Sequence, residues 1–541
     1  MTIVTHAKRI TAALVVMMIA AVTVGTVYAL PEDARILVWF APTAPGNGSP
    51  TAVGATETGV IGLMDSTGAV EPLIDVPDQT TVVEPCGERA TSPNGQYFAF
   101  YMGRALEFNE GDIYLMDGQN PPISIRETAT APLLRSVCLG AGTFRYSPDS
   151  SKLGYIAFEP GSGTDDFADG FFKVYDIATG EYIFRRESVT AFDISDGQAA
   201  FLNFFTNERG EADEVAIQLW DQARNADAEL ATLTPDEPVN EEDRTRCKFE
   251  SGSVHFLPDS RLSVILGQSC FGGPDPHTSW ILYTIDYSGG SSVTRVKEGR
   301  IIEGTTGGYQ AFARTNVQYV TPNGDGLIFT TPDVITANTA AVWYADLDDL
   351  ANPVQLIQRQ AVMPGNTRPD NATPVISIDR RWLAFTETTP DASTVANQLK
   401  IFDMNDLTLE PIVFSAGSPG DAVQAMQFTQ DSSRLFAVIG GDTGGGVGGE
   451  NRISAVNLAD GSNFNVERGR FNDALVVSPD ATEVVIGNTI VLEDPRQPNY
   501  FNTENIIIDP PFSSVETLYQ GAVIEEGEVV ERSFANPIAW R

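Results

Sequence analysis

Histidine is the side chain that proteins use most often as a general base and as a metal ligand, and this chain has three. His6 precedes a long apolar stretch near the N-terminus. His255 lies in a strand-like run before Pro258, where we expect it to pack against neighbouring strands. His277 follows Pro276 in a loop-like segment, and a role in a site is the alternative interpretation of it. So few histidines argue against a Ser-His-Asp triad and against a histidine-rich metal centre.

The cysteines can form disulfides, because their number is even and they fall into two pairs that are close in sequence. In an oxidising compartment we expect the bonds Cys86–Cys138 and Cys247–Cys270. Four cysteines permit three pairings, and four buried thiols are the alternative. A zinc site is disfavoured, since the spacings are unlike a CxxC motif and histidine is scarce.

Two acidic segments, 165–170 and 346–349, carry oxygen ligands of the kind that calcium prefers. Neither matches an EF-hand loop, and a chain with 72 acidic residues will form such clusters by chance. The glycine-rich segment 444–449 lies between two strand-like runs and is typical of a flexible loop rather than of a phosphate-binding loop. A Gly-x-Ser-x-Gly nucleophile motif is absent from the sequence. The sequence therefore predicts no catalytic residue, no metal and no cofactor.

The charge of the chain is strongly negative, with 72 Asp and Glu against 34 Lys and Arg and a formal net charge of −38. A field of this sign repels phosphate backbones, so nucleic acid is excluded as a partner. We interpret the acidity as a means of keeping an exported protein soluble. A surface that attracts divalent cations or basic partners is the alternative.

Residues 1–29 predict export from the cytoplasm. Lys8 and Arg9 precede an uncharged, mostly apolar stretch at 10–28, and small residues at Val27 and Ala29 are typical of a cleavage site. The stretch is also long enough to remain in the bilayer as an anchor. Because the basic residues precede it, both outcomes place residues 30–541 outside the cytoplasm, in the periplasm, at the cell surface or secreted.

One short phrase recurs along the rest of the chain. A turn of the type Ser-Pro-Asp-Gly is followed each time by an apolar run, as in Ser92–Gly95 before Tyr97–Tyr101. Proline presets the backbone of the turn, Asp or Asn bonds to it, and Gly tolerates a positive φ. Clear copies and weaker copies together give eight registers, which start at Ser92, Ser147, Ile194, Leu257, Thr321, Ser377, Thr429 and Ser478.

A second recurring segment follows the first along the chain and ends at an aspartate, as in Asp112–Asp117 and Phe172–Asp176. We interpret the two phrases as the second and third strands of a four-stranded unit of about 50 residues, which is typical of a propeller blade. The segment 36–74 lacks a first strand, and Phe534–Trp540 supplies one. The sequence thus predicts an all-β fold in which residues 30–541 form a single β-propeller of about eight blades, with seven to nine open, closed by pairing of the terminal strands.

These turns, together with the aliphatic and aromatic strand after them and the later strand that ends in Asp, resemble TolB-like β-propeller repeats, relatives of the WD-repeat propellers. The resemblance covers residues 85–520 and implies a fold rather than a function, because the motif residues shape turns and cores. The sequence departs from TolB in lacking a separate N-terminal domain. It also lacks the Gly-His and Trp-Asp signatures of WD repeats.

The function that these observations favour is that of a non-enzymatic binding or scaffolding protein of the cell envelope or exterior. Its expected partner is a protein or an envelope component. Since a fold does not dictate a function, an enzyme remains the alternative. That enzyme would be a lyase or a glycan hydrolase with paired carboxylates at the mouth of the ring.

Overall fold

The structure is a computed structural model, and it describes residues 36–540 with gaps. The gaps are 44–58, 66, 77–79, 87–89, 105–109, 119, 128–133, 137–143, 159–169, 237–245, 273–276, 302–317, 333–338, 362–374, 388–397, 416–420, 442–450, 491–499, 510–511 and 526–527. The predicted signal or anchor segment, the glycine-rich segment 444–449 and residues 165–169 lie outside the described residues. Among the residues that are described, no helix is long and apolar enough to cross a membrane.

The recurring turns form as their residue types predict. In the second clear copy the Ser147 hydroxyl donates to Asp149 Oδ1 at 2.6 Å, and the amide of Lys152 donates to Ser147 Oγ at 2.9 Å. The fourth turn position has a positive φ, 72° at Gly95 and 61° at Ser150. Each turn therefore reverses the chain between two antiparallel strands, and the apolar run after it becomes the second strand of a blade.

The pairings of the described strands form nine four-stranded antiparallel units, which we number as blades in chain order. Blade 1 combines both ends of the described chain: β38 (Glu528–Trp540), β1 (Ile36–Thr43), β2 (Gly59–Met64) and β3 (Val70–Val76), with β37 (Ala522–Glu525) added at the edge. Blade 2 contains β4 (Thr80–Pro85), β5 (Phe98–Arg104), β6 (Glu110–Met116) and β7 (Ile123–Ser124). Blade 3 contains β9 (Phe144–Tyr146), β10 (Lys152–Phe158), β11 (Gly170–Asp176) and β12 (Glu181–Glu187), and β8 (Leu134–Ser136) links it to blade 2.

The next blades repeat the order first, second, third and fourth strand. Blade 4 contains β13 (Val189–Ile194), β14 (Gln198–Thr206), β15 (Ala212–Asp221) and β16 (Ala226–Leu233). Blade 5 contains β17 (Arg246–Phe256), β18 (Arg261–Phe271), β19 (His277–Asp286) and β20 (Ser292–Ile301). Blade 6 contains β21 (Gln318–Val320), β22 (Gly326–Pro332), β23 (Thr339–Asp346) and β24 (Val354–Ala361).

The last three blades complete the ring. Blade 7 contains β25 (Val375–Ile376), β26 (Trp382–Glu387), β27 (Gln398–Asp403) and β28 (Ile412–Ser415). Blade 8 contains β29 (Asp421–Phe428), β30 (Arg434–Gly441), β31 (Asn451–Asn457) and β32 (Asn463–Gly469). Blade 9 contains β33 (Phe471–Val477), β34 (Glu483–Ile490), β35 (Tyr500–Asp509) and β36 (Phe512–Gln520). The prediction of an all-β single propeller of about eight blades, with seven to nine open, is confirmed for the fold, and the described pairings give nine such units rather than eight.

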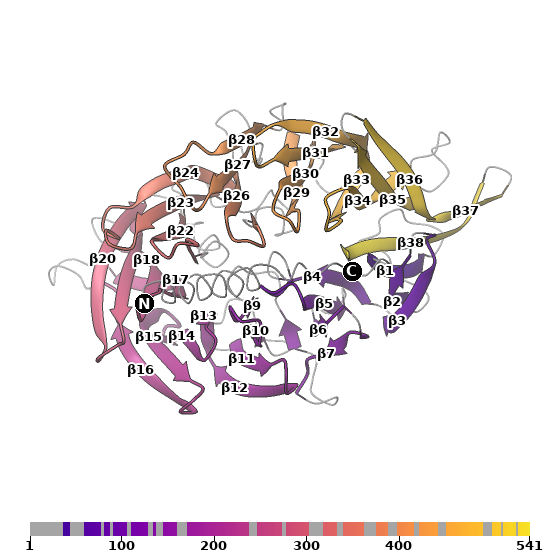
Figure 1. The fold of residues 1–541 in the computed structure, drawn as a ribbon. Helices are drawn as coiled ribbons and strands as arrows, with labels where there is room; N and C mark the ends of the chain where they lie inside the picture. The colour runs from indigo at the N-terminus through magenta and orange to yellow at the C-terminus, as the bar shows by residue number, and fades with distance from the viewer. Residues whose placement is uncertain are drawn as a thin grey trace, which may run out of the picture.

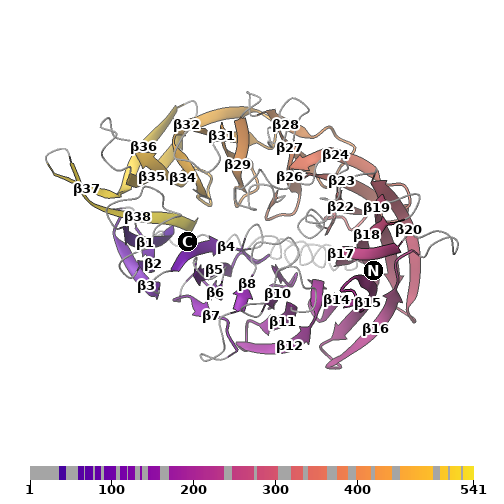
Figure 2. The same cartoon turned by 180° about the vertical axis from the view of Figure 1, so that it is seen from behind.

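The blades stand side by side around a centre, with their first strands inside and their fourth strands outside (Figures 1 and 2). Each pair of neighbouring blades shares a buried hydrophobic cluster. Large apolar side chains of the second strands lie at these contacts, for example Phe201, Phe385 and Phe436, which are fully buried. The second strands carry long apolar runs because blades cover them on both faces.

Blade 1 joins the two ends of the described chain. β38 pairs with β1 along its length, from Ile36 opposite Trp540 to Thr43 opposite Arg532. Trp39 packs edge to face on Phe534, with ring centroids 5.0 Å apart. The innermost strand of this blade thus comes from the C-terminal end, while the outer three come from the N-terminal part.

Candidate functional site

A cavity of about 410 Å³ opens where the first strands of blades 3 to 7 end. The last residues of β9, β13, β17, β21 and β25 line it, together with turn residues of blade 2. Because first strands face the middle of the ring (Figure 1), the cavity lies at the ring centre, on the side of the recurring turns.

Three ionisable side chains meet in this cavity. Asp193 of blade 4 accepts a hydrogen bond from Arg145 Nη1 of blade 3 and forms an ion pair with it. The other oxygen of Asp193, Oδ2, lies 2.7 Å from His255 Nδ1 of blade 5 and accepts a hydrogen bond at 2.9 Å from the amide of Phe256. Arg145 Nη1 also lies 2.9 Å from His255 Nδ1. Asp193 therefore bridges two basic side chains from the blades on either side.

The three residues occupy one position of the repeat. In the structure each lies two residues before the residue whose amide bonds across the turn, which is Ser147 for Arg145, Ser195 for Asp193 and Leu257 for His255. In blade 4 this residue comes one later than the register start at Ile194, because the turn there is shorter. The position faces the ring centre, so three successive blades place Arg, Asp and His side by side. The corresponding residues of the other registers are Ala90, Tyr319, Val375, Gln427 and Val476.

Asp193 is ionised in this setting. Burial by itself would raise the pKa of Asp193, but the charges of Arg145 and His255 and the hydrogen bonds from His255 and the Phe256 amide lower it below its ordinary value. An ionised carboxylate can only accept hydrogen bonds, so the proton between Asp193 and His255 belongs to Nδ1 of the histidine. Both carboxylate oxygens are thus engaged by donors, which leaves Asp193 poorly placed to act as a base.

The wall of the cavity is mostly apolar. Pro148, Pro258, Phe256, Ile376 and Ile378 line it, and Ile378 is 47% exposed. Arg380, the fourth residue of the blade 7 turn, lines it as well and has a φ of 58°.

Gln318 holds one side of this wall. Its side chain is buried, donates from Nε2 to Ser253 Oγ at 2.7 Å and accepts from Ser263 Oγ at 2.5 Å. These bonds connect the first strand of blade 6 to the first two strands of blade 5. The cavity wall is therefore held in place across the boundary between the two blades.

The rim of the cavity is reinforced by hydrogen bonds between turns of neighbouring blades. The amide of Asn94 in blade 2 donates to Ser150 Oγ in blade 3 at 3.0 Å. The amide of Asp149 in blade 3 donates to Asp196 Oδ1 in blade 4 at 2.9 Å. Lys152 Nζ also donates to the Asp196 carbonyl at 2.6 Å. The turn residues that define the repeat thus connect the blades as well as shaping them.

The structure corrects the interpretation of two histidines. His255 does lie in a strand, β17, but its side chain lines the cavity instead of packing within a blade. His277 is the first residue of β19, paired with Cys270, and not a loop residue. The acidic segment 346–349 forms a turn, in which the amide of Asp348 donates to Asp346 Oδ1 at 2.8 Å. Within the described residues no group of acidic, histidine or cysteine side chains could hold a metal ion.

The cluster at Asp193 was not predicted from the sequence. The registers read from the sequence hide it, because Phe192 and not Asp193 lies two residues before the fourth register start at Ile194. Arg145 and Asp193 are 48 residues apart, and Arg145 and His255 are 110 apart. Only the structure, with its shorter turn in blade 4, places them together.

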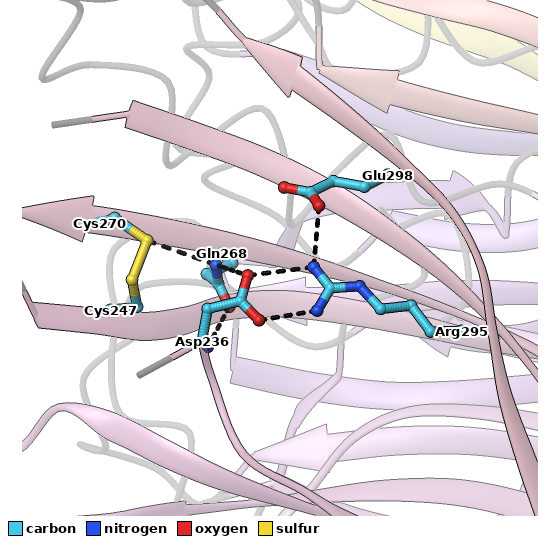
Figure 3. A network of polar contacts seen from close by, with 6 residues as sticks. All are labelled: Asp236, Cys247, Gln268, Cys270, Arg295 and Glu298. Carbon is cyan, nitrogen blue, oxygen red and sulfur yellow. Dashed lines mark hydrogen bonds and ion pairs between the residues drawn. A yellow bond between two sulfur atoms is a disulfide. The ribbon is translucent and has the colours of Figure 1, made fainter. Parts of the chain in front are cut away.

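A second polar cluster surrounds the disulfide between Cys247 and Cys270, which join β17 and β18 (Figure 3). Next to it Gln268 Nε2 donates to Asp236 Oδ2 at 3.0 Å, and Arg295 makes two hydrogen bonds to Asp236 at 2.7 and 3.0 Å. These bonds from Arg295 are the main cause that lowers the pKa of Asp236.

This cluster fastens the chain between blades 4 and 5, because Asp236 follows β16 while its partners belong to blade 5. Cys86 is also disulfide-bonded and buried, and its predicted partner Cys138 lies outside the described residues.

The ring of four-stranded blades defines the class of protein as a β-propeller. No family model matches the sequence, and no curated protein matches it. Among solved structures, the propeller domain of the Trilobed protease from Pyrococcus furiosus is similar, with 12% identity, 72% of this chain and 98% of that chain covered and a TM-score of 0.35.

Two further solved structures are similar in the same way. A TolB-like protein from Agrobacterium tumefaciens has 14% identity, with 63% of this chain and 96% of that chain covered and a TM-score of 0.28. An oligogalacturonate lyase in complex with manganese has 12% identity, with 76% of this chain and 95% of that chain covered and a TM-score of 0.38. These likenesses concern the fold.

Proposed function

We propose that this protein is a non-enzymatic binding propeller that acts outside the cytoplasm, with its binding site in the cavity at the ring centre. The observation that supports binding is the cavity itself, whose volume of about 410 Å³ lies within the usual range of roughly 300–1,000 Å³ for ligand pockets. Its apolar wall holds a small number of converging polar groups, which is typical of such pockets.

Catalysis by paired carboxylates has less support. Among the described residues that line the cavity Asp193 is the one carboxylate, and Arg145, His255 and the Phe256 amide already engage it. A lyase or glycan hydrolase of the expected kind would need a second carboxylate within reach. We therefore favour binding over chemistry.

The signal-like residues 1–29 and the disulfide Cys247–Cys270 support a place of action in the periplasm, at the cell surface or in the exterior. The recurring turns support a relation to TolB-like propellers. The partner that we infer is a protein or an envelope component. The group that enters the cavity is carried by that partner or comes free in solution.

Binding of Nile red, a neutral apolar dye, tests this proposal. We expect dye fluorescence to rise on titration with the protein, and Ile378→Trp to remove most of the rise, because a larger side chain at residue 378 fills the cavity mouth. Ile123 is a matched control, since it is 53% exposed on the outer strand β7, and Ile123→Trp should leave dye binding unchanged. Equal dye binding by both variants would show that the cavity is not the site.

A further inference from the structure

We propose that the group bound in the cavity is an organic anion, a carboxylate or similar acid carried on an apolar body. This inference rests on the proposed function and adds the chemical class of the ligand. The described lining of the cavity carries more cationic than anionic side chains, whereas the whole chain is strongly acidic.

The described cavity is basic in a very acidic protein. The chain has a formal net charge of −38, yet the cavity is lined by the guanidinium groups of Arg145 and Arg380 against the single carboxylate of Asp193 among its described residues. Two guanidinium groups against one carboxylate favour anions inside the cavity over the rest of the acidic surface.

Asp193 orients this positive charge without cancelling it. The carboxylate neutralises one unit of charge and holds Arg145 and His255 in place from two neighbouring blades. Arg380 lines the cavity from blade 7, and its positive charge adds to that of this cluster. A bound acid would thus be drawn to the cavity by guanidinium groups, which are well suited to carboxylates.

The apolar wall of the cavity indicates which kind of molecule carries the acid group. Phe256, Leu257, Tyr319, Ile376 and Ile378 surround the charged cluster with apolar surface. Burial of an apolar body against these side chains is favourable, whereas a small inorganic anion would leave most of the wall without a partner. The combination therefore fits an acid with an aromatic or aliphatic body.

Calorimetric titration of the whole protein with three benzene derivatives of similar shape tests the charge preference. We expect benzoate to bind at least about ten-fold more tightly than benzamide, since one hydrogen bond to a charged group is worth about that factor. Benzylamine should bind more weakly than benzamide, and sulfate should not compete with benzoate. N-acetylphenylalanine, run beside its amide, stands for the chain end of a protein partner. Tighter binding of N-acetylphenylalanine than of benzoate would identify the acid as the chain end of a protein partner. Tighter binding of benzoate would identify it as a free small molecule.

The variant Arg380→Gln should reduce the preference for benzoate over benzamide to within about three-fold, because it removes a cation from the wall. Arg224→Gln is the matched control, since its side chain is 82% exposed on the turn between β15 and β16, and it should leave the preference unchanged. Equal affinity for all three benzene derivatives or stronger binding of benzylamine would overturn the anion inference, whereas full competition by sulfate would overturn the inference of an apolar body. If Nile red still bound, the proposed function would stand; loss of all binding would overturn both.

Discussion

At the scale of single residues, one position of the repeat is apolar or neutral in most blades and forms the polar cluster of the cavity in three of them. Two residues before each recurring turn, most blades carry an apolar or neutral side chain, whereas blades 3, 4 and 5 carry Arg145, Asp193 and His255. Asp193 is buried and lies between the other two. Removing its charge would leave two basic side chains facing a neutral amide in a buried setting, which is strongly unfavourable.

We therefore expect Asp193→Asn to lower the free energy of unfolding by about 3 kcal/mol at neutral pH. The pKa of Asp193 is lower in the folded protein than in the unfolded chain, so its charge stabilises the fold above the unfolded pKa of about 4. This stabilisation is lost as the pH falls towards the folded pKa. The stability difference between the two proteins should therefore shrink as the pH falls below about 4.

Chemical denaturation at several pH values measures this difference. Asp259→Asn is the control, because Asp259 is 55% exposed in its pair with Arg261 and such pairs contribute little. A difference for Asp193→Asn that stays below about 1 kcal/mol at pH 7, or that grows as the pH falls below about 4, would contradict the bridging role.

At the scale of elements, the disulfide and the Asp236 cluster act on the same junction. Cys247 and Cys270 lie directly opposite each other in the pairing of β17 with β18. Asp236, which follows β16, is fastened to Gln268 of β18 and Arg295 of β20. Because β17 also supplies His255 to the cavity, the first strand of blade 5 is held both at its start and at its end.

The double variant Cys247→Ser/Cys270→Ser should lower the free energy of unfolding by about 3 kcal/mol, the loop-closure value for a bond that spans 23 residues. Peptide mapping without reducing agent should recover Cys247 linked to Cys270 and Cys86 linked to Cys138. Four alkylatable thiols in protein from its native compartment would reject both bonds.

At the scale of the whole molecule, the ring depends on the pairing of β38 with β1. β38 also packs against blade 9, where Thr503 Oγ1 donates to the Ala535 carbonyl at 2.5 Å. The strand therefore belongs to two interfaces at once. Its loss would leave β1 with an unpaired edge and would expose apolar surface of blade 9.

Deletion of residues 529–541 should lower the melting temperature by more than about 5 °C. Phe534 is buried, and the loss of such a side chain alone contributes roughly 3–5 kcal/mol. Trp540 is partly buried and adds less. Val523→Ala on the edge strand β37, where Val523 is 48% exposed, is the control and should change little. A truncated protein that melts within about two degrees of the full chain would show that the ring does not need this strand.

The sequence by itself determined the repeat, and with it the fold. A blade is made by strands that follow one another in the chain, so its pairing depends on turns whose residue types are visible locally, such as Ser147 to Ser150. The apolar runs after these turns became second strands because a strand covered on both faces must be apolar throughout, as Phe201 and Phe436 are. Phe534–Trp540 could be recognised in the sequence as a first strand because the segment 36–74 lacks one, and in the structure it pairs with β1.

Only the tertiary structure decided which polar residues meet. Arg145, Asp193 and His255 belong to three different blades, and each by itself looks like one polar residue in a strand. Their contact depends on the curvature of the ring, which brings the ends of successive first strands together at the centre. That curvature arises from the packing of whole blades against each other and not from any local motif. The fold was therefore predictable from neighbouring residues, whereas the site required the closed ring.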